Sequence, residues 1–77
     1  MNNKIDISYL NSSSKERHLL IDSIGFDVFL EPQKKVFIRY KIIENFDFHI
    51  DDSAEIIYLM SDSIPTEIKL ESGEVIW

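Results

Sequence analysis

Apolar residues recur at every second position over the central part of the sequence. Between residues 26 and 50 they occupy nearly every even position, and these positions are Phe26, Val28, Leu30, Val36, Ile38, Tyr40, Ile42, Phe46, Phe48 and Ile50. Successive side chains of an extended strand point to opposite faces, so this spacing puts the apolar side chains on one face of a sheet. The pattern predicts three strands, at residues 26–30, 36–42 and 46–50.

The first two of these strands are predicted to pair as a hairpin. Facing residues of a packed sheet must share a side, and this requirement fixes the register. The loop of residues 31–35 then sets Leu30 opposite Val36, and Pro32 suits the second position of a type I turn.

The second and third strands are predicted to form the next hairpin. A three-residue loop at 43–45 pairs Tyr40 with Phe48 and places Asn45 in the left-handed conformation that asparagine tolerates. Opposite charges facing across strands contribute about 0.2–1 kcal/mol each. On the other face this register sets Lys41 opposite Asp47 and Arg39 opposite His49, and across the earlier hairpin Asp27 lies opposite Arg39.

The N-terminal third predicts a strand followed by a helix. Residues 4–10 alternate apolar and polar side chains, as a half-buried strand does. Ser13 and Glu16 have the spacing of a capping box, and Gly25 suits the position after a helix end. We therefore predict a helix at residues 14–24, and its apolar face comprises Leu20, Ile21 and Ile24.

The C-terminal part adds further strands. Residues 54–60 predict a strand because they are rich in β-branched and aromatic side chains. A turn at 51–53 would set Phe48 opposite Ile56, and a last hairpin is expected around Ser72 and Gly73. Together these elements predict an α+β fold in a single domain, residues 1–77. It is a mostly antiparallel meander of about five to seven strands with one short N-terminal helix on one face, in the order β-α-β-β-β-β plus a C-terminal hairpin.

Length and composition exclude several classes of function. A chain of 77 residues buries only about 60% of the surface that its unfolded form exposes, so a large enclosed active site is not expected. There is no cysteine, which excludes disulfides, thiolate zinc sites and thiol nucleophiles. The only glycines are Gly25 and Gly73, too few for a phosphate-binding loop, so no nucleotide or other cofactor is predicted.

No segment of the sequence predicts export or membrane insertion. The longest apolar run, Ile56 to Met60, is far shorter than the roughly 20 residues of a membrane-spanning helix. The first residues lack the apolar core of a signal peptide. We therefore expect a cytoplasmic protein with no membrane partner.

Charge is distributed unevenly along the chain. Residues 1–43 carry seven Lys/Arg and five Asp/Glu, a net +2, whereas residues 44–77 carry only Lys69 against nine acids, a net −8, which sums to the −6 of the whole chain. A strongly acidic surface repels phosphate backbones and attracts basic partners. The alternative is that the acids only confer solubility.

Asp47, His49 and Asp51 alternate along the third predicted strand. Two carboxylates and an imidazole on one face are possible ligands of Zn²⁺ or Mn²⁺. In the predicted register, however, Lys41 and Arg39 face two of them and compete with a cation. An ion-paired, solvated face is therefore the preferred interpretation, and a metal site is the alternative.

The odd-numbered face of the predicted sheet has two further interpretations. An aromatic and basic platform that stacks single-stranded nucleic acid is one; its residues would be Phe29, Phe37, Arg39 and Lys41. Neighbouring aspartates and the negative net charge oppose it, so no direct nucleic-acid binding is expected. The other is a partner interface, since Ile57 and Leu59 would add apolar area to this face, unless the C-terminal hairpin folds over it.

The sequence leads to a small acidic, non-enzymatic protein-binding module that docks its acidic C-terminal half on a basic surface of a partner protein. Many small inhibitors, immunity proteins and phage-encoded antagonists share this length, charge and lack of cofactor motifs, and this analogy is compositional only. The residues predicted to contact the partner are Asp47, Asp51, Asp52, Glu55, Asp62, Tyr58 and Phe37. The alternatives are a homo-oligomeric assembly module, through opposite charges or paired sheet edges, and a metal-dependent enzyme using Asp47, His49 and Asp51.

Overall fold

The chain folds into an all-β structure, which the computed structural model describes for residues 3–42, 44–53 and 55–77. These residues contain no helix, so the predicted α+β class is wrong. The seven strands are β1 (Lys4–Leu10), β2 (Arg17–Ile21), β3 (Phe26–Leu30), β4 (Lys35–Lys41), β5 (Phe48–Asp52), β6 (Ile56–Ser61) and β7 (Pro65–Leu70).

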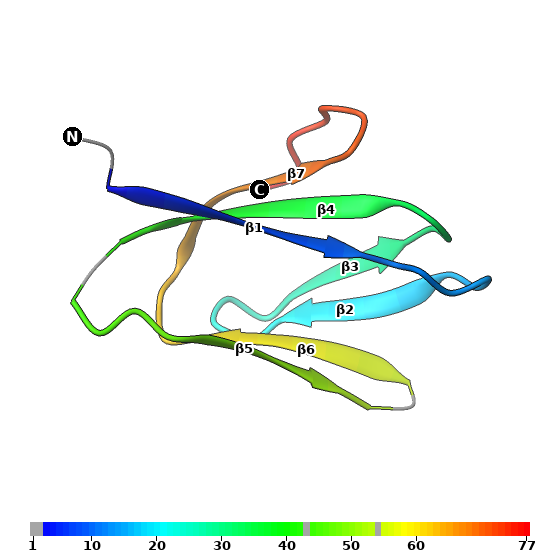
Figure 1. The fold of residues 1–77 in the computed structure, drawn as a ribbon, viewed down its shortest axis with the longest axis horizontal. Coiled ribbons are helices and arrows are strands. Elements are labelled where there is room, and N and C mark those ends of the chain that lie inside the picture. The colour runs from blue at the N-terminus through cyan, green and yellow to red at the C-terminus, as the bar shows by residue number, and fades with distance from the viewer. Residues whose placement is uncertain (1–2, 43, 54) are drawn as a thin grey trace.

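The strands form two sheets that pack face to face (Figure 1). Sheet A is three-stranded, in the order β1-β4-β7, and both of its pairings are antiparallel. Sheet B is four-stranded, in the order β3-β2-β6-β5, and its β2–β6 pairing is parallel. The predicted simple meander is therefore also wrong, because β3, β4 and β5 follow one another in sequence but alternate between the sheets.

The core lies between the two sheets and follows the alternation seen in the sequence. Its fully or almost fully buried apolar residues are Leu19, Ile21, Val28, Leu30, Val36, Ile38, Tyr40, Ile57, Leu59 and Ile68. The predicted buried face of β3 and β4 is thus confirmed. The pattern weakens in β5, an edge strand of sheet B, where Ile50 remains 45% exposed.

The predicted β3–β4 hairpin is wrong, although its faces are right. In β3, Val28 pairs with Leu19 of β2, whereas Ile38 of β4 pairs with Ile7 of β1. The two even faces meet across the core instead of side by side. The connection does turn at Pro32, with a hydrogen bond from the Lys34 N–H to the Glu31 carbonyl (3.3 Å), but Gln33 has φ 64°, which excludes type I.

The predicted helix at 14–24 is replaced by a loop and strand β2. Asn11 is buried, and its amide group donates to the carbonyls of Lys15 (2.8 Å) and Leu30 (2.9 Å). The Ser13 hydroxyl donates to the Asn11 Oδ1 (2.6 Å) and so does not cap a helix. Gly25 does adopt a positive φ (63°), but in the turn between β2 and β3.

The β5–β6 pairing is confirmed, but its register is wrong. Phe48 lies opposite Ser61 rather than Ile56. The predicted β4–β5 hairpin is also wrong, since the two strands belong to different sheets; the left-handed Asn45 (φ 64°) is confirmed. With both predicted hairpins absent, none of the three predicted cross-strand pairs forms. The ion pairs among the described residues include Asp6–Arg39, Arg17–Asp52 and His18–Asp27.

The C-terminal residues fold back along β7. Gly73 (φ 98°) closes the expected turn, and Val75 forms a single bridge with Lys69. The Ile76 N–H donates to the Ile68 carbonyl (2.8 Å), so this segment covers the outer edge of β7. Across residues 3–42, 44–53 and 55–77 there is no helix of the length and apolarity that crossing a bilayer requires.

Candidate protein-binding surface

One face of sheet B points away from the core and is apolar at its centre. Because Leu19, Ile57 and Leu59 point inward, the alternating residues of β2 and β6 point outward. The half-buried centre comprises Leu20, Ile56, Tyr58 and Met60, and the rim comprises His18, Asp27, Phe29, His49 and Asp51. We call these nine residues the sheet B outer face.

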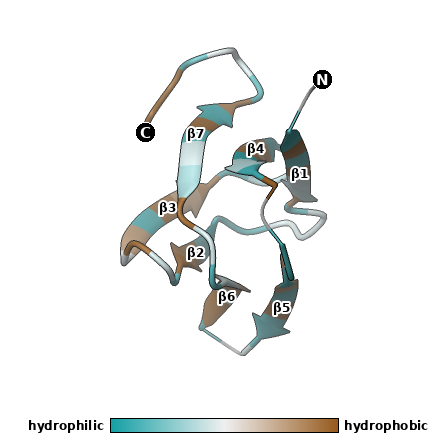
Figure 2. Ribbon diagram, turned by 90° about the vertical axis from the view of Figure 1, so that its left-hand side faces the viewer, coloured by the Kyte–Doolittle hydropathy of each residue, from teal (hydrophilic) through white to brown (hydrophobic). Residues whose placement is uncertain are grey.

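Strand β6 makes this face apolar because it is apolar on both sides. It lies between β2 and β5, and Figure 2 shows it largely in the hydrophobic colour beside a mainly hydrophilic β5. Its inward residues are fully buried, whereas Tyr58 and Met60 are only half-buried. A sheet face of this kind, apolar at the centre with a polar rim, has the composition of a protein interface.

One part of the rim is a cluster of three side chains, His18, Asp27 and Phe29. The His18 Nε2 lies 2.6 Å from the Asp27 Oδ1, and the imidazole stacks on Phe29 with ring centroids 4.5 Å apart. Phe29 is 59% exposed. The carboxylate and the aromatic ring together fix the orientation of the imidazole, so this rim is ordered although it lies at the surface.

Acidic side chains cluster on the hairpin that forms the opposite part of the rim. Residues 44–62 contain six of the fourteen acids and no Lys or Arg, and they form β5, β6 and the flanking loops. We call this segment the acidic hairpin. The other residues carry eight acids and eight Lys/Arg, so the hairpin accounts for the whole net charge of −6.

The predicted contact residues are distributed over the two ends of the acidic hairpin. Asp47 and Asp62 flank the Phe48–Ser61 pair at one end. The other end, about 17 Å away at 3.3 Å per residue, carries Asp51, Asp52 and Glu55. Tyr58 lies directly opposite Asp51, so an aromatic side chain and a carboxylate are neighbours on the sheet B outer face.

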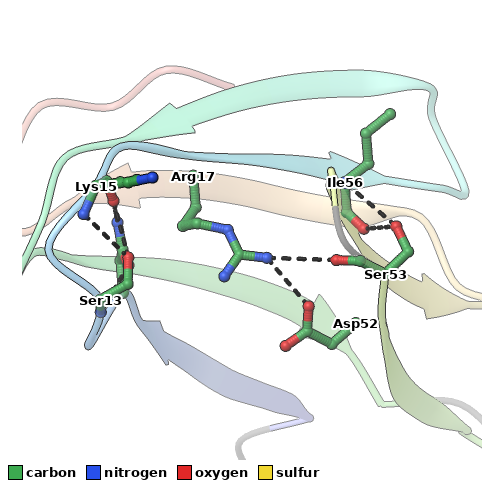
Figure 3. A network of polar contacts seen from close by, with 7 residues as sticks. Ser13, Lys15, Arg17, Asp52, Ser53 and Ile56 are labelled. Carbon is green, nitrogen blue, oxygen red and sulfur yellow. Dashed lines mark hydrogen bonds and ion pairs between the residues drawn. The ribbon is translucent and has the colours of Figure 1, made fainter.

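Among the acids of the hairpin, Asp52 forms an ion pair with Arg17. Arg17 donates from Nη2 to the Asp52 carboxylate (3.1 Å) and to the Ser53 carbonyl (3.4 Å). Figure 3 shows this guanidinium between the end of β5 and the turn that follows. In that turn the Ser53 hydroxyl and the Ile56 carbonyl are hydrogen-bonded (2.5 Å), which fixes the tip of the hairpin.

Phe37 is not part of this surface. It lies on β4 in sheet A, opposite Ser8 of β1 and Lys69 of β7. Glu67, Glu71 and Glu74 of the acidic C-terminal half are also outside the hairpin, on β7 and in the turn that follows it. The C-terminal half therefore does not form a single acidic surface.

The structure does not bring Asp47, His49 and Asp51 together as a group of three ligands. His49 and Asp51 share the sheet B outer face with Met60 and Tyr58, and Asp47 precedes the strand. Within the described ranges no group of three His, Cys, Asp or Glu side chains is placed to hold a metal ion.

The outer face of sheet A carries charge of the opposite sign, of which the sequence analysis identified only Arg39 and Lys41. Five of the eight Lys/Arg lie here with two acids; the seven are Lys4, Lys35, Arg39, Lys41, Lys69, Asp6 and Glu67. Arg39 donates to both oxygens of Asp6 (2.7 and 3.2 Å), and this hydrogen-bonded guanidinium lowers the pKa of Asp6. Lys35 and Lys41 both occupy odd positions of β4, so alternation alone puts them on one face. Lys4 of β1 and Lys69 of β7 lie on the same face only because these strands are the neighbours of β4.

Comparison with models of protein families, with curated proteins and with solved structures finds no match to this chain. Any functional conclusion therefore depends on the chemistry of these surfaces.

Proposed function

We propose that the protein is a non-enzymatic protein-binding module of the inhibitor or antagonist type. It docks the acidic hairpin and the adjoining sheet B outer face on a basic surface of a partner protein. The observation that carries the proposal is the concentration of charge. Residues 44–62 hold six carboxylates, all of them exposed, and no Lys or Arg, and β5 and β6 of this segment pair as a hairpin.

The acids supply orientation and speed of association. Charges at a rim steer a partner of opposite sign and raise the association rate, while contributing less to the lifetime of the complex. The two acidic ends of the hairpin, with Asp47 and Asp62 at one and Asp51 and Glu55 at the other, would present charge on both sides of the contact.

The apolar centre supplies the lifetime. Large aromatic side chains at the middle of an interface dominate its binding energy when the partner excludes water from them. Tyr58 is half-buried between Leu20 of β2 and Asp51 of β5, so its ring is held in place before binding. We propose Tyr58 as the anchor and the hairpin acids as the rim.

Charge reversal tests the acidic rim once the partner has been captured from the native cell and purified. The double variant Asp51→Lys, Asp62→Lys should slow association about tenfold at low salt and reduce its salt dependence. Asp52 is left unchanged because it pairs with Arg17. The matched control, Glu71→Lys with Glu74→Lys, changes net charge equally on the C-terminal turn. Equal slowing by both double variants would show that only net charge matters.

The anchor is tested separately. Tyr58→Ala should raise the dissociation constant about 30-fold, the effect of a 2 kcal/mol interface anchor, chiefly through faster dissociation. Phe37→Ala is the matched aromatic truncation on sheet A and should leave affinity unchanged. A larger loss for Phe37→Ala than for Tyr58→Ala would move the interface to sheet A and overturn the proposal.

A further inference from the structure

Strand β1 is an exposed edge of unusual regularity. It has seven residues, lies at the end of sheet A and pairs only with β4 among the described strands. The opposite edge, β7, is covered by the C-terminal residues. Sheet B has two edge strands, β3 and β5, and each has five residues against the seven of β1.

The backbone groups that β1 offers can be identified residue by residue. At its two ends the Asn11 N–H donates to the Lys34 carbonyl (2.9 Å), and the Ile42 N–H donates to the Asn3 carbonyl (2.5 Å). Hydrogen-bonded and non-bonded pairs alternate along an antiparallel ladder. The odd residues of β1 therefore turn their backbone groups toward β4, and the even residues, Lys4, Asp6, Ser8 and Leu10, turn theirs outward.

We infer that two copies of this chain pair through β1, antiparallel about a twofold axis at Ile7. This dimer is separate from the proposed partner contact on sheet B. In this register Asp6 lies opposite Ser8 of the second copy, and Ser8 lies opposite Asp6 of the second copy. Both pairs join outward-turned residues, and each pair can exchange two hydrogen bonds. The two three-stranded sheets become one six-stranded sheet.

The side chains of β1 complement themselves in this register. On the inward face Ile7 meets Ile7 of the second copy and Ile5 meets Tyr9. Ile5 is 36% exposed, and Ile7 and Tyr9 are half-buried, so pairing extends the apolar contact between the sheets. A twofold contact of one strand with itself is closed, which removes the open edge without forming a fibre.

Neighbouring registers are worse. A shift that centres the axis on Asp6 puts two carboxylates directly opposite each other, which is destabilising. A shift that centres it on Ser8 leaves fewer residues paired. Shifts that pair odd with even residues place apolar side chains on the charged face. In the chosen register the two Asp6 side chains are diagonal neighbours, and each is compensated by Arg39 of its own chain (2.7 Å).

The sign of the salt effect separates this dimer from a charge-driven assembly. Each copy carries a net charge of −6, so the copies repel each other at long range. Added salt screens this repulsion and should strengthen a dimer held by backbone hydrogen bonds and apolar contacts. In contrast, a dimer formed by the acidic hairpin of one copy and the outer face of sheet A of another should weaken as salt is added.

Sedimentation of the purified full chain over a range of concentrations tests the inference. We expect a monomer–dimer equilibrium that shifts toward dimer as salt rises. Ser8→Pro removes an outward N–H and spares the bonds to β4, and it should weaken dimerisation at least about a hundredfold. Ser8→Thr should dimerise normally. Ile50→Pro, the same change at an outward N–H of the β5 edge, should also dimerise normally.

Two measurements keep the test independent of how well Ser8→Pro folds. In the wild-type protein the amides of Asp6, Ser8 and Leu10 should exchange with solvent more slowly at high protein concentration, whereas that of Ile50 should not change. The single cysteine of Ile7→Cys should form an intermolecular disulfide on mild oxidation, because Ile7 faces its own copy in a close, non-hydrogen-bonded pair; Ser8→Cys should not.

A monomer at every concentration and salt, or a dimer that Ile50→Pro abolishes and Ser8→Pro does not, would overturn the inference. Neither result would affect the proposed function, because that proposal concerns sheet B and is tested with the partner protein.

Discussion

Two aromatic contacts connect the sheets on opposite sides of the core, and their polar groups are treated differently. On one side Trp77, which follows β7, packs on Phe26 of β3 with ring centroids 5.5 Å apart, and its indole N–H donates to the Pro65 carbonyl (3.1 Å). On the other side Tyr40 of β4 packs on Phe48 of β5 at 6.0 Å. The Tyr40 hydroxyl is buried, and no partner for it lies among the described residues.

The two contacts differ in how much apolar area they bury and in whether the polar group of the aromatic side chain has a hydrogen-bond partner. Trp77 is 47% exposed, so much of its ring stays in contact with water, and its N–H keeps a hydrogen bond to the Pro65 carbonyl. Tyr40 is fully buried and contributes more apolar contact, but its hydroxyl loses hydration without a replacement bond. We expect Tyr40 to stabilise the fold more than Trp77 does. We also expect the unpartnered hydroxyl to offset part of the stabilisation that burial of the Tyr40 ring provides.

Removing the Tyr40 ring should have the largest effect. Tyr40→Ala leaves a cavity against Phe46 and Phe48 and should lower the free energy of unfolding by about 4 kcal/mol. A domain of this length has only about 4–12 kcal/mol in total, so the variant should be close to unfolded in urea titrations. Phe37→Ala, on the outer face of the same strand, should cost about 1 kcal/mol. Equal losses would contradict the importance of the buried contact.

A buried polar side chain with a full set of partners should come next. Asn11 is buried, donates two hydrogen bonds and accepts two from Ser13. Asn11→Ala leaves the buried Leu30 carbonyl without this donor and should cost about 3 kcal/mol. Ser12→Ala changes an exposed side chain of the same loop and should cost less than about 0.5 kcal/mol. A small loss for Asn11→Ala would show that the loop holds its conformation without the amide.

The half-exposed contact should matter less than either. Trp77→Ala should lower the free energy of unfolding by about 2 kcal/mol, roughly half the value for a fully buried tryptophan. Val75→Ala, in the same segment and 54% exposed, should cost about 0.5 kcal/mol. If Trp77→Ala destabilised the protein as much as Tyr40→Ala, exposure would not separate the two sides of the core.

The smallest effect should be a gain. Tyr40→Phe keeps the ring and removes the unpartnered hydroxyl, so it should raise the free energy of unfolding by about 1 kcal/mol.

The same variant predicts a change in alkaline stability. Burial raises the pKa of Tyr40 in the folded state, whereas the unfolded chain ionises near the ordinary value of about 10. The folded state holds the Tyr40 hydroxyl in its neutral form, so ionisation of this group costs no stability below pH 10. Above pH 10 the unfolded chain ionises first, and stability is lost as the pH rises through the folded pKa. Thermal unfolding above pH 10 should show a steeper loss in the wild-type protein than in Tyr40→Phe. Parallel curves would indicate that the hydroxyl is solvated.

The segregation of charge in the candidate site was visible in the sequence, but its geometry was not. The run from residue 42 to 68 without Lys or Arg contains the acidic hairpin and also Glu67 of β7, so the limits of the hairpin come from the strands. That Tyr58 faces Asp51, and that Phe37 lies on the other sheet, depends on strand pairing, which alternation does not specify.

Outside residues 14–24 the sequence by itself determined most of the extended segments and turns, and in β3 and β4 it determined which face is buried. Period-two alternation selects a face, and the left-handed conformations of Gly25 and Asn45 follow from residue type. Only the tertiary structure decided which strands are neighbours, because the same apolar face can meet its partner beside it in one sheet or across a core in another. It also decided that Arg17–Ile21 is a strand. The burial of Leu19 and Ile21 between the sheets outweighs a local capping pattern that contributes only about 1 kcal/mol.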